Sequence, residues 1–371
     1  MNQYLKTFLT AILFTMFFLV RPGHTQELVE GEDFVLVTHD GGAGGYEAFP
    51  DICRLADGRL FCVFYDGYKH ISYPNASTFK TGGRISACYS EDEGKTWSDP
   101  FVVFDSPFDD RDPSVTALSD GTILCNFFIL DKIPYENQKK PYRKLGQWYV
   151  RSTDNGMTWS EPIPITDDHW ASAPIRILKN GRWIIGEYGM DPDWDAGVAI
   201  SDDEGKHWRK VKIPTGDFLL AAETDIFQRS DGSLLAYIRH REGFGPQPMV
   251  YSVSYDNGDT WSQGESAGFS GHCPYFCQTP EGVLVLGTRT GYTPLEGEGV
   301  VPHSTTIRIS FDEGNSWSTP VTVDTHHGAY PSMVNLRDGS TLIVYYEEGK
   351  GSNIRARKFR IENGSVLWLK F

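Results

Sequence analysis

Three side chains that could perform acid–base or nucleophilic chemistry lie at the same distance from an Asp-Gly pair in three parts of the chain. Tyr330 lies eight residues before the pair at 338, Glu223 eight before the pair at 231, and Asp112 eight before the pair at 120. If these turns are equivalent in the fold, the three side chains converge. Phenol and carboxyl groups that lie close together can exchange protons, so this convergence would suit acid–base chemistry.

Cationic residues fall in the same register. Arg239 lies eight residues after Asp231, Arg289 ends the corresponding strand of the next repeat, and Arg111 directly precedes Asp112. Guanidinium groups bind carboxylates through paired hydrogen bonds, so converging arginines would hold an anionic group. Asp51 is a further carboxylate near the same strand ends, and His272 lies nearby in the same register.

Each of these residues also has a structural explanation. Tyr330 could pack in an aromatic channel, and Arg111 could be neutralised by the acidic residues that flank it. His272 could be a hydrogen-bonded structural histidine. Glu223 and Asp225 would share one strand face, which is unusual unless that face lines a polar channel. Together with Arg239, the register favours function for Tyr330 and Glu223, and both explanations stay open for Arg111, Asp112 and Arg289.

A short repeat indicates the elements that position these residues. The pattern Ser-x-Asp-x-Gly-x-x-Trp, called here the Asp-box, occurs five times, at 90–97, 152–159, 201–208, 254–261 and 310–317. Its Asp can accept backbone N–H bonds within a turn, its Gly can take a positive φ, and its Trp can cover the turn. We therefore expect structural hairpin turns rather than catalytic sites.

A second pattern interleaves with the Asp-boxes. Apolar runs flank an Asp-Gly, Asn-Gly or Glu-Gly pair six times, at 57, 120, 180, 231, 281 and 338. Each pair predicts a hairpin of two strands, and each box joins two more. Four antiparallel strands, repeated six times, predict an all-β, six-bladed β-propeller. The sixth repeat has no box, and the run 34–38 is a candidate strand for closing the ring.

Composition and the N-terminal segment limit the function classes. The net charge of −15 argues against nucleic acid and anionic membranes as partners. Lys6 followed by the apolar run 7–20 predicts a signal peptide over residues 1–25, with one domain at 26–371 and a secreted or periplasmic location.

Cys53 and Cys62 lie symmetrically about the turn at 57–58, so either a disulfide or two small strand residues fits. No cysteine spacing indicates a metal site, no membrane insertion is expected, and we expect a monomer.

The five Asp-boxes, the six-hairpin register and the C-terminal run FRIENGSVLWL resemble the sialidase (neuraminidase) superfamily over nearly the whole mature chain. The resemblance implies a Tyr nucleophile paired with a Glu, three arginines that hold the substrate carboxylate, an Asp acid/base and no cofactor. By position it assigns the nucleophile to Tyr330, its base to Glu223 and one arginine to Arg239. Glu347 resembles a glutamate that supports an arginine. A neutral Tyr suits a substrate whose own carboxylate would repel an anionic nucleophile.

The chain departs from that family pattern at three places. Ala48 stands where the first arginine is expected, the third falls near Pro302 and His303, and the loop 67–84 contains no Asp to match the acid/base. Arg111 and Arg289 could compensate from other blades, and Asp112 or Asp51 could supply the proton.

These observations predict a secreted exo-acting glycoside hydrolase that removes a terminal acidic sugar from a glycan or oligosaccharide. Two alternatives stay open. A polysaccharide lyase acting on uronate would use Arg239, His240, His272 and Tyr330, and a carbohydrate-binding propeller without catalysis would keep only the scaffold.

Overall fold

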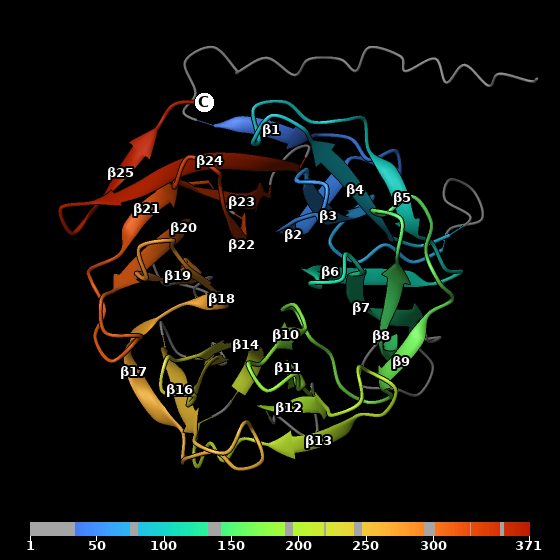
Figure 1. Cartoon of the computed structure of the whole chain (residues 1–371). Coiled ribbons are helices and arrows are strands. Elements are labelled where there is room, and N and C mark those ends of the chain that lie inside the picture. Colours follow the sequence, from blue (N-terminus) through green and yellow to red (C-terminus); the bar gives the residue numbers. More distant parts are fainter. Residues whose placement is uncertain are drawn as a thin grey trace, which may run out of the picture.

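The fold is described from a computed structural model that covers residues 34–74, 81–132, 142–189, 196–218, 220–240, 247–292, 301–326, 328–348 and 352–371. Its regular elements are β-strands, arranged as six sheets around a central axis (Figure 1). Within these ranges we find no helix that is long and apolar enough to cross a bilayer. The expected signal peptide, 1–25, lies outside the described residues.

The first three blades each contain four antiparallel strands. Blade one is formed by β2 (Tyr46–Arg54), β3 (Leu60–Gly67), β4 (Arg84–Ser90) and β5 (Phe101–Phe104). Blade two is formed by β6 (Asp109–Ala117), β7 (Ile123–Lys132), β8 (Tyr142–Ser152) and β9 (Ile163–Thr166). Blade three is formed by β10 (Arg176–Ile177), β11 (Trp183–Tyr188), β12 (Ala196–Ser201) and β13 (Arg209–Lys212).

The remaining blades repeat this plan. Blade four is formed by β14 (Leu220–Gln228), β15 (Leu234–His240), β16 (Pro248–Ser254) and β17 (Glu265–Ser270). Blade five is formed by β18 (His272–Gln278), β19 (Leu284–Tyr292), β20 (Val301–Ser310) and β21 (Val321–Asp324). Blade six contains β22 (Gly328–Asn335), β23 (Thr341–Glu347), β24 (Asn353–Glu362), β25 (Ser365–Leu369) and β1 (Val35–Thr38).

The ring closes by pairing the N-terminal strand with the last blade, as the sequence suggested. β1 pairs antiparallel with the first half of β24, where Val35 lies opposite Ala356, and β25 pairs with the second half of the same strand. The Arg355 guanidinium lies 4.2 Å from the centre of the Phe34 ring, which adds a cation–π contact to this junction. The two ends of the described chain therefore meet in one sheet.

The hairpin between β2 and β3 corrects one sequence expectation. The Leu55 N–H donates to the Arg59 carbonyl and the Gly58 N–H to the Leu55 carbonyl, both at 2.9 Å, and Gly58 has a φ of 92°. This is a three-residue loop with glycine in the left-handed conformation, not the two-residue loop assumed from the sequence. The extra residue shifts the register, so Cys62 lies opposite Ile52 and Cys88 rather than Cys53, and all six cysteines are free thiols.

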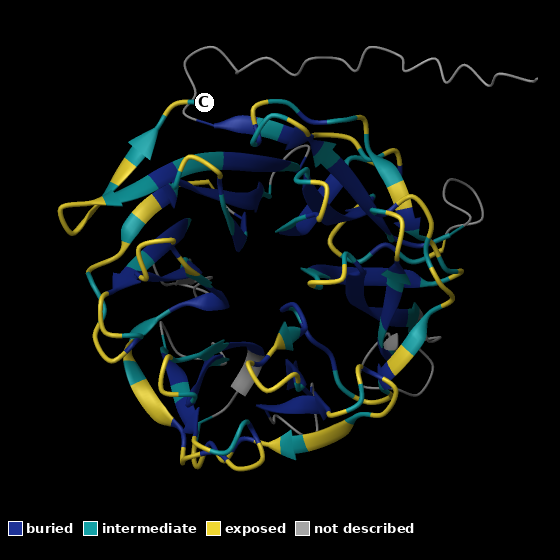
Figure 2. Cartoon of the chain, in the orientation of Figure 1, coloured by how far each residue is buried: buried dark blue, intermediate teal, exposed yellow. Residues whose placement is uncertain are grey.

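The Asp-boxes form the predicted turns. In the first box, Asp92 accepts hydrogen bonds from the Thr96 N–H at 2.9 Å, the Thr96 hydroxyl at 2.6 Å and the Ser90 hydroxyl at 3.0 Å. The Trp97 indole N–H donates to the Gly94 carbonyl at 3.2 Å and so covers the turn. Buried strands between these turns and the central axis supply the core, while the exposed residues gather on turns and outer strands (Figure 2).

Candidate active site

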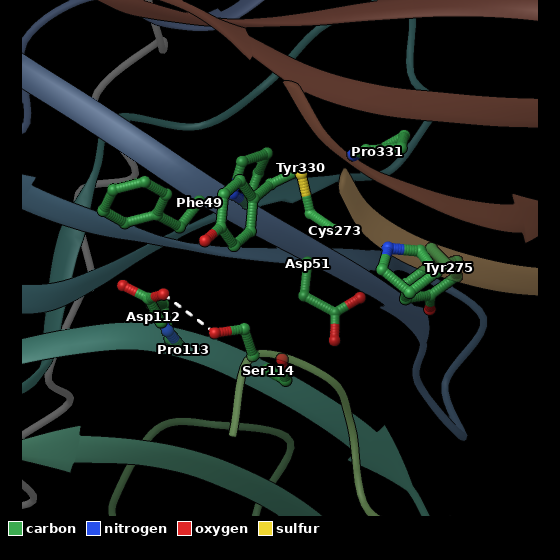
Figure 3. A pocket seen from close by; sticks show the side chains of 12 residues that line it. Phe49, Asp51, Asp112, Pro113, Ser114, Cys273, Tyr275, Tyr330 and Pro331 are labelled. Carbon is green, nitrogen blue, oxygen red and sulfur yellow. Dashed lines mark hydrogen bonds between the residues drawn. The ribbon is translucent and has the colours of Figure 1, made fainter. Parts of the chain in front are cut away.

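Equivalent positions of the six innermost strands and their lead-in segments bring six side chains to one level of the channel. They lie eight residues before each hairpin turn, and we call them the upper ring: Phe49, Asp112, Ser172, Glu223, Cys273 and Tyr330. Five of them line one pocket, and Figure 3 shows Phe49, Asp112 and Tyr330 around it. The sixth, Glu223, binds directly to Tyr330.

Four upper-ring residues have an unusual backbone. Phe49, Asp112, Cys273 and Tyr330 have φ angles of 53°, 47°, 44° and 46°, and each is followed by a proline. The strand register shifts at each of them, so each begins a β-bulge. Non-glycine residues adopt this conformation at an energetic cost that tertiary structure must offset, and such strain is concentrated at functional sites.

The structure brings Tyr330 and Glu223 together, although 107 residues separate them. The Tyr330 hydroxyl donates to Glu223 Oε1 at 2.9 Å, and Arg239 Nη1 donates to the same oxygen at 2.7 Å. Burial favours the neutral acid, but Arg239 and His272 outweigh it and hold the Glu223 pKa below its usual value. Burial and the nearby Glu223 carboxylate raise the Tyr330 pKa well above its usual range, so the phenol keeps its proton until Glu223 accepts it.

Asp112 lies in the same ring with a carboxyl group suited to proton transfer. The Ser172 hydroxyl donates to Oδ2 at 2.9 Å, a bond drawn as a dashed line in Figure 3. Oδ1 is buried and accepts no hydrogen bond from the described residues. Burial raises the Asp112 pKa to about 6 against the opposing effect of Arg111, so this group can gain and lose a proton near neutral pH.

Asp51, the alternative proton donor, lies two residues after Phe49 on β2, and both of its carboxylate oxygens accept hydrogen bonds. It accepts hydrogen bonds from the Ile52 and Val115 N–H groups at 2.8 and 2.9 Å and from the Ser332 hydroxyl. Val115 and Ser332 belong to the two neighbouring blades. Asp51 therefore links blade one to both neighbouring blades through hydrogen bonds, which favours a structural role. Asp112 remains the candidate acid/base.

Arg111 is buried and compensated locally. Its guanidinium lies 3.5 Å from both Asp109 and Asp112, and it stacks 5.2 Å from the centre of the Phe49 ring. It also donates to the His70 carbonyl, so a loop of blade one covers it. Arg111 is therefore neutralised by its acidic neighbours in this conformation, which is the structural explanation given for it in the sequence analysis.

Arg289 and Glu347 have partners that the sequence did not indicate. Arg289 Nη2 lies 2.7 Å from His272 Nδ1, which puts a guanidinium and an imidazole side by side on blade five. Glu347 accepts a hydrogen bond from Asn353 at 3.0 Å and lies 3.5 Å from Arg355. Glu347 thus supports an arginine of β24, not one of the three candidate substrate-binding arginines.

Two groups at this site were missed by the sequence analysis. Ser172 shares the eight-residue offset, so the register itself could have identified it. His70 lies on the loop after β3; its ring packs 5.4 Å from Phe49, and Tyr46 Oη lies 3.0 Å from its Nδ1. No offset rule reaches His70, because it belongs to an irregular loop.

The described residues contain no cluster of acidic, His and Cys side chains that could hold a metal ion.

Known proteins with similar sequences point to one family. The model of the BNR repeat-like domain matches residues 89–344. A sialidase from Paraclostridium sordellii is 25% identical over 243 residues, and one from Clostridium perfringens is 25% identical over 244 residues. Each alignment covers 56% of this chain, and it covers 56% and 60% of the respective relative, so the chain matches little more than half of their lengths.

Solved structures agree on the fold. A protein of unknown function from Dyadobacter fermentans superposes with a TM-score of 0.73 at 23% identity, covering 88% of this chain and 97% of that one. A sialidase from Streptococcus pneumoniae superposes with a TM-score of 0.65 at 14% identity, covering 89% and 71%. From the matching domain model, the homologous sequences and this shared six-bladed ring, the chain belongs to the BNR repeat-like domain family of the sialidase superfamily.

Proposed function

We propose that this protein is an exported exo-glycoside hydrolase that removes a terminal acidic sugar from a glycan, with Tyr330 as nucleophile. The observation that carries the proposal is the hydrogen bond from the Tyr330 hydroxyl to Glu223, whose carboxylate is held in its ionised form by Arg239. The similarity to curated sialidases supports a glycan substrate. Export rests on the signal-peptide pattern of residues 1–25.

The first step would form a glycosyl–enzyme bond. Glu223 takes the Tyr330 proton as the phenol oxygen attacks the anomeric carbon, and the bond from that carbon to the leaving oxygen breaks. Asp112, protonated below about pH 6, gives its proton to the leaving oxygen. The sugar is then attached to Tyr330 and the aglycone departs as an alcohol.

The second step would reverse these roles. Asp112 takes a proton from water, and the water oxygen attacks the anomeric carbon. The bond to the Tyr330 oxygen breaks, and Glu223 returns the proton to the phenol. The product keeps the anomeric configuration of the substrate, because the same carbon is displaced twice.

The acidic group of the substrate would bind beside blades four and five. Arg239 on β15 and Arg289 on β19 occupy equivalent positions, each eight residues after its hairpin turn, and Arg239 keeps 21% of its side chain exposed. Arg111 is neutralised by Asp109 and Asp112, so we assign it a smaller share of the attraction. Two arginines in this position favour a carboxylated sugar over a neutral one.

The test is turnover of aryl glycosides, including an aryl sialoside and aryl uronides, by the native chain and by Tyr330→Phe. We expect a loss on the order of a thousandfold in kcat/KM, because the variant keeps the ring and removes the nucleophile. The matched control is Tyr89→Phe, which removes a phenol that binds the Asn155 carbonyl between blades one and two. Equal activity of Tyr330→Phe and the control would refute the nucleophile, and an unsaturated uronate product would indicate a lyase instead.

A further inference from the structure

A groove on the side of blades four and five lies apart from the candidate active site. It is lined by Tyr251, Tyr255, Phe269, Arg308 and Trp317, among others. Because β14 starts at the upper ring and successive strands are antiparallel, β16 runs away from that ring. Tyr255 directly follows β16, so the groove follows the outer strands of blade four and its Tyr255 end points away from the upper ring.

Aromatic rings form one wall of this groove. Tyr237 stacks against Tyr251 with ring centres 6.1 Å apart at 24°, and against Phe269 at 6.0 Å and 20°. The Trp317 indole N–H donates to the Tyr237 hydroxyl at 2.8 Å, which fixes this ring. Tyr255 is 81% exposed, which is unusual for a large aromatic side chain. Tyr255 therefore offers an exposed aromatic face beside this wall, and the C–H face of a pyranose can pack against such a face.

Arg308 gives the groove an uncompensated positive charge. Its guanidinium stacks 4.1 Å from the centre of the Phe269 ring, and Nη1 donates to the Ser318 carbonyl at 2.6 Å. Its Nε is buried and has no hydrogen-bond partner among the described residues, which also supply no carboxylate to pair with this side chain. Burial lowers the Arg308 pKa, as expected for a cation that lacks a counter-charge.

The neighbouring charges do not cancel Arg308. Arg229 adds a second guanidinium, whose Nε donates to the Glu313 carbonyl at 2.9 Å. Glu265 is exposed and accepts the Tyr251 hydroxyl at 2.7 Å, so its carboxylate is directed at Tyr251. A partly buried guanidinium whose Nε lacks a hydrogen-bond partner is stabilised when a ligand supplies an anion.

We propose that this groove is a second saccharide site, which binds an anionic sugar residue through aromatic stacking and an ion pair with Arg308. In an enzyme acting on a long glycan, such a site would hold the polymer on the side of the propeller while the terminal residue is cleaved at the upper ring. Binding here does not depend on whether Tyr330 is catalytic, so the two proposals fail separately.

The test is affinity electrophoresis of the full chain through gels that contain polygalacturonate, dextran sulfate or neutral dextran. We expect polygalacturonate or dextran sulfate to retard the native chain, although its net charge of −15 opposes attraction to a polyanion. Arg308→Gln and Tyr255→Ala should each weaken this retardation by about tenfold, through loss of the charge or of the stacking face. The matched control is Phe311→Ala, which removes a 65% exposed aromatic residue that does not line the groove.

The outcomes separate the components of the proposal. Retardation by polygalacturonate alone identifies a carboxylate as the ligand group, and retardation by dextran sulfate alone identifies a sulfate. Equal retardation by neutral dextran, unaffected by Arg308→Gln, would overturn the anionic ligand. Equal losses in Phe311→Ala and Tyr255→Ala, or no loss in either groove variant, would overturn the site. An unchanged midpoint of thermal unfolding for both groove variants checks that they are folded.

Discussion

At the scale of single residues, the candidate site depends on backbone conformations that a regular strand would not supply. Tyr330 and Asp112 both have a positive φ directly before a proline, and the bulge that follows turns each side chain toward the channel. Proline restricts the preceding residue and removes a ladder N–H, so it suits a bulge at the end of an inner strand. The chemistry of these two positions is therefore tied to strained local geometry, which the surrounding sheets must stabilise.

The pH dependence of activity belongs to this scale. Asp112 must carry a proton in the first step, and its raised pKa of about 6 predicts that kcat/KM falls as pH rises through about 6. Glu223 must be ionised, and its lowered pKa places the acid limb below the usual carboxyl range. We expect Asp112→Asn to abolish the fall of kcat/KM near pH 6. It should also lower turnover of a substrate with a poor leaving group by at least about a hundredfold.

Leaving-group dependence provides the control for Asp112. An activated aryl glycoside needs little protonation, so Asp112→Asn should retain more activity on it than on an alkyl glycoside. A variant that loses both substrates equally, or that keeps the native limb near pH 6, would show that another group supplies the proton. Ser172→Ala is a useful second variant, because it removes the hydrogen bond to Asp112 at 2.9 Å and keeps the carboxyl group.

At the scale of elements, the Asp-boxes connect neighbouring blades as well as turning the chain. A Cβ built on Gly94 would lie 2.9 Å from Leu342 of blade six, and one on Gly258 would lie 2.8 Å from Ile184 of blade three. Each of these glycines also has a positive φ, 87° and 94°. The boxes therefore require glycine for two reasons, the turn and the close approach of the preceding blade.

Loss of one box carboxylate should weaken the fold and leave the chemistry intact. Asp92→Ala removes three hydrogen bonds at a partly buried turn, and we expect the free energy of unfolding to fall by about 1–2 kcal/mol. Urea titration measures this change. The matched control is Glu91→Ala, an exposed neighbour, which should change stability by less than about 0.5 kcal/mol. A drop in kcat/KM of folded Asp92→Ala would contradict a purely structural role for the box.

The sequence predicted elements better than side-chain partners. The repeated turns revealed six hairpins, and equal offsets brought Tyr330 to Glu223 because the blades are related by rotation about one axis. The disulfide alternative failed at Cys53 and Cys62 because one extra loop residue shifts every pair in the hairpin. The pairing of Arg289 with His272 depends on side-chain conformations, and the cover over Arg111 depends on an irregular loop; neither follows from a repeat.

At the scale of the whole molecule, a chain of net charge −15 buries several carboxyl groups with raised pKa values. Burial raises the pKa of Glu47 and Asp110 to about 8, and that of Glu187 to about 7. Carboxylates in exposed boxes behave oppositely, because hydrogen bonds from Thr158 lower the pKa of Asp154 to about 2. The fold therefore holds some protons more tightly than the unfolded chain does and holds others less tightly.

The two groups of carboxyls predict where stability is greatest. Glu187 binds its proton more tightly when folded, so its contribution is present below about pH 4 and is lost as pH rises through about 7. Asp154 contributes above about pH 4 and loses that contribution as pH falls through about 2. We therefore expect the midpoint of thermal unfolding to peak on the acid side of neutrality and to fall between about pH 5 and pH 8.

Glu187→Gln isolates one buried carboxyl within this trend. Glu187 is 1% exposed and accepts the Thr166 hydroxyl at 2.7 Å, a bond that the amide oxygen of Gln can also accept. Removing the ionisable group should shrink the loss of unfolding free energy between about pH 5 and pH 8, by at most about 3 kcal/mol for a shift of this size. Glu161→Gln, at an exposed position, should leave the slope unchanged. Identical slopes for both variants would mean that Glu187 ionises in the folded protein as it does in the unfolded chain, and that the buried carboxyls do not set the pH range in which the propeller is most stable.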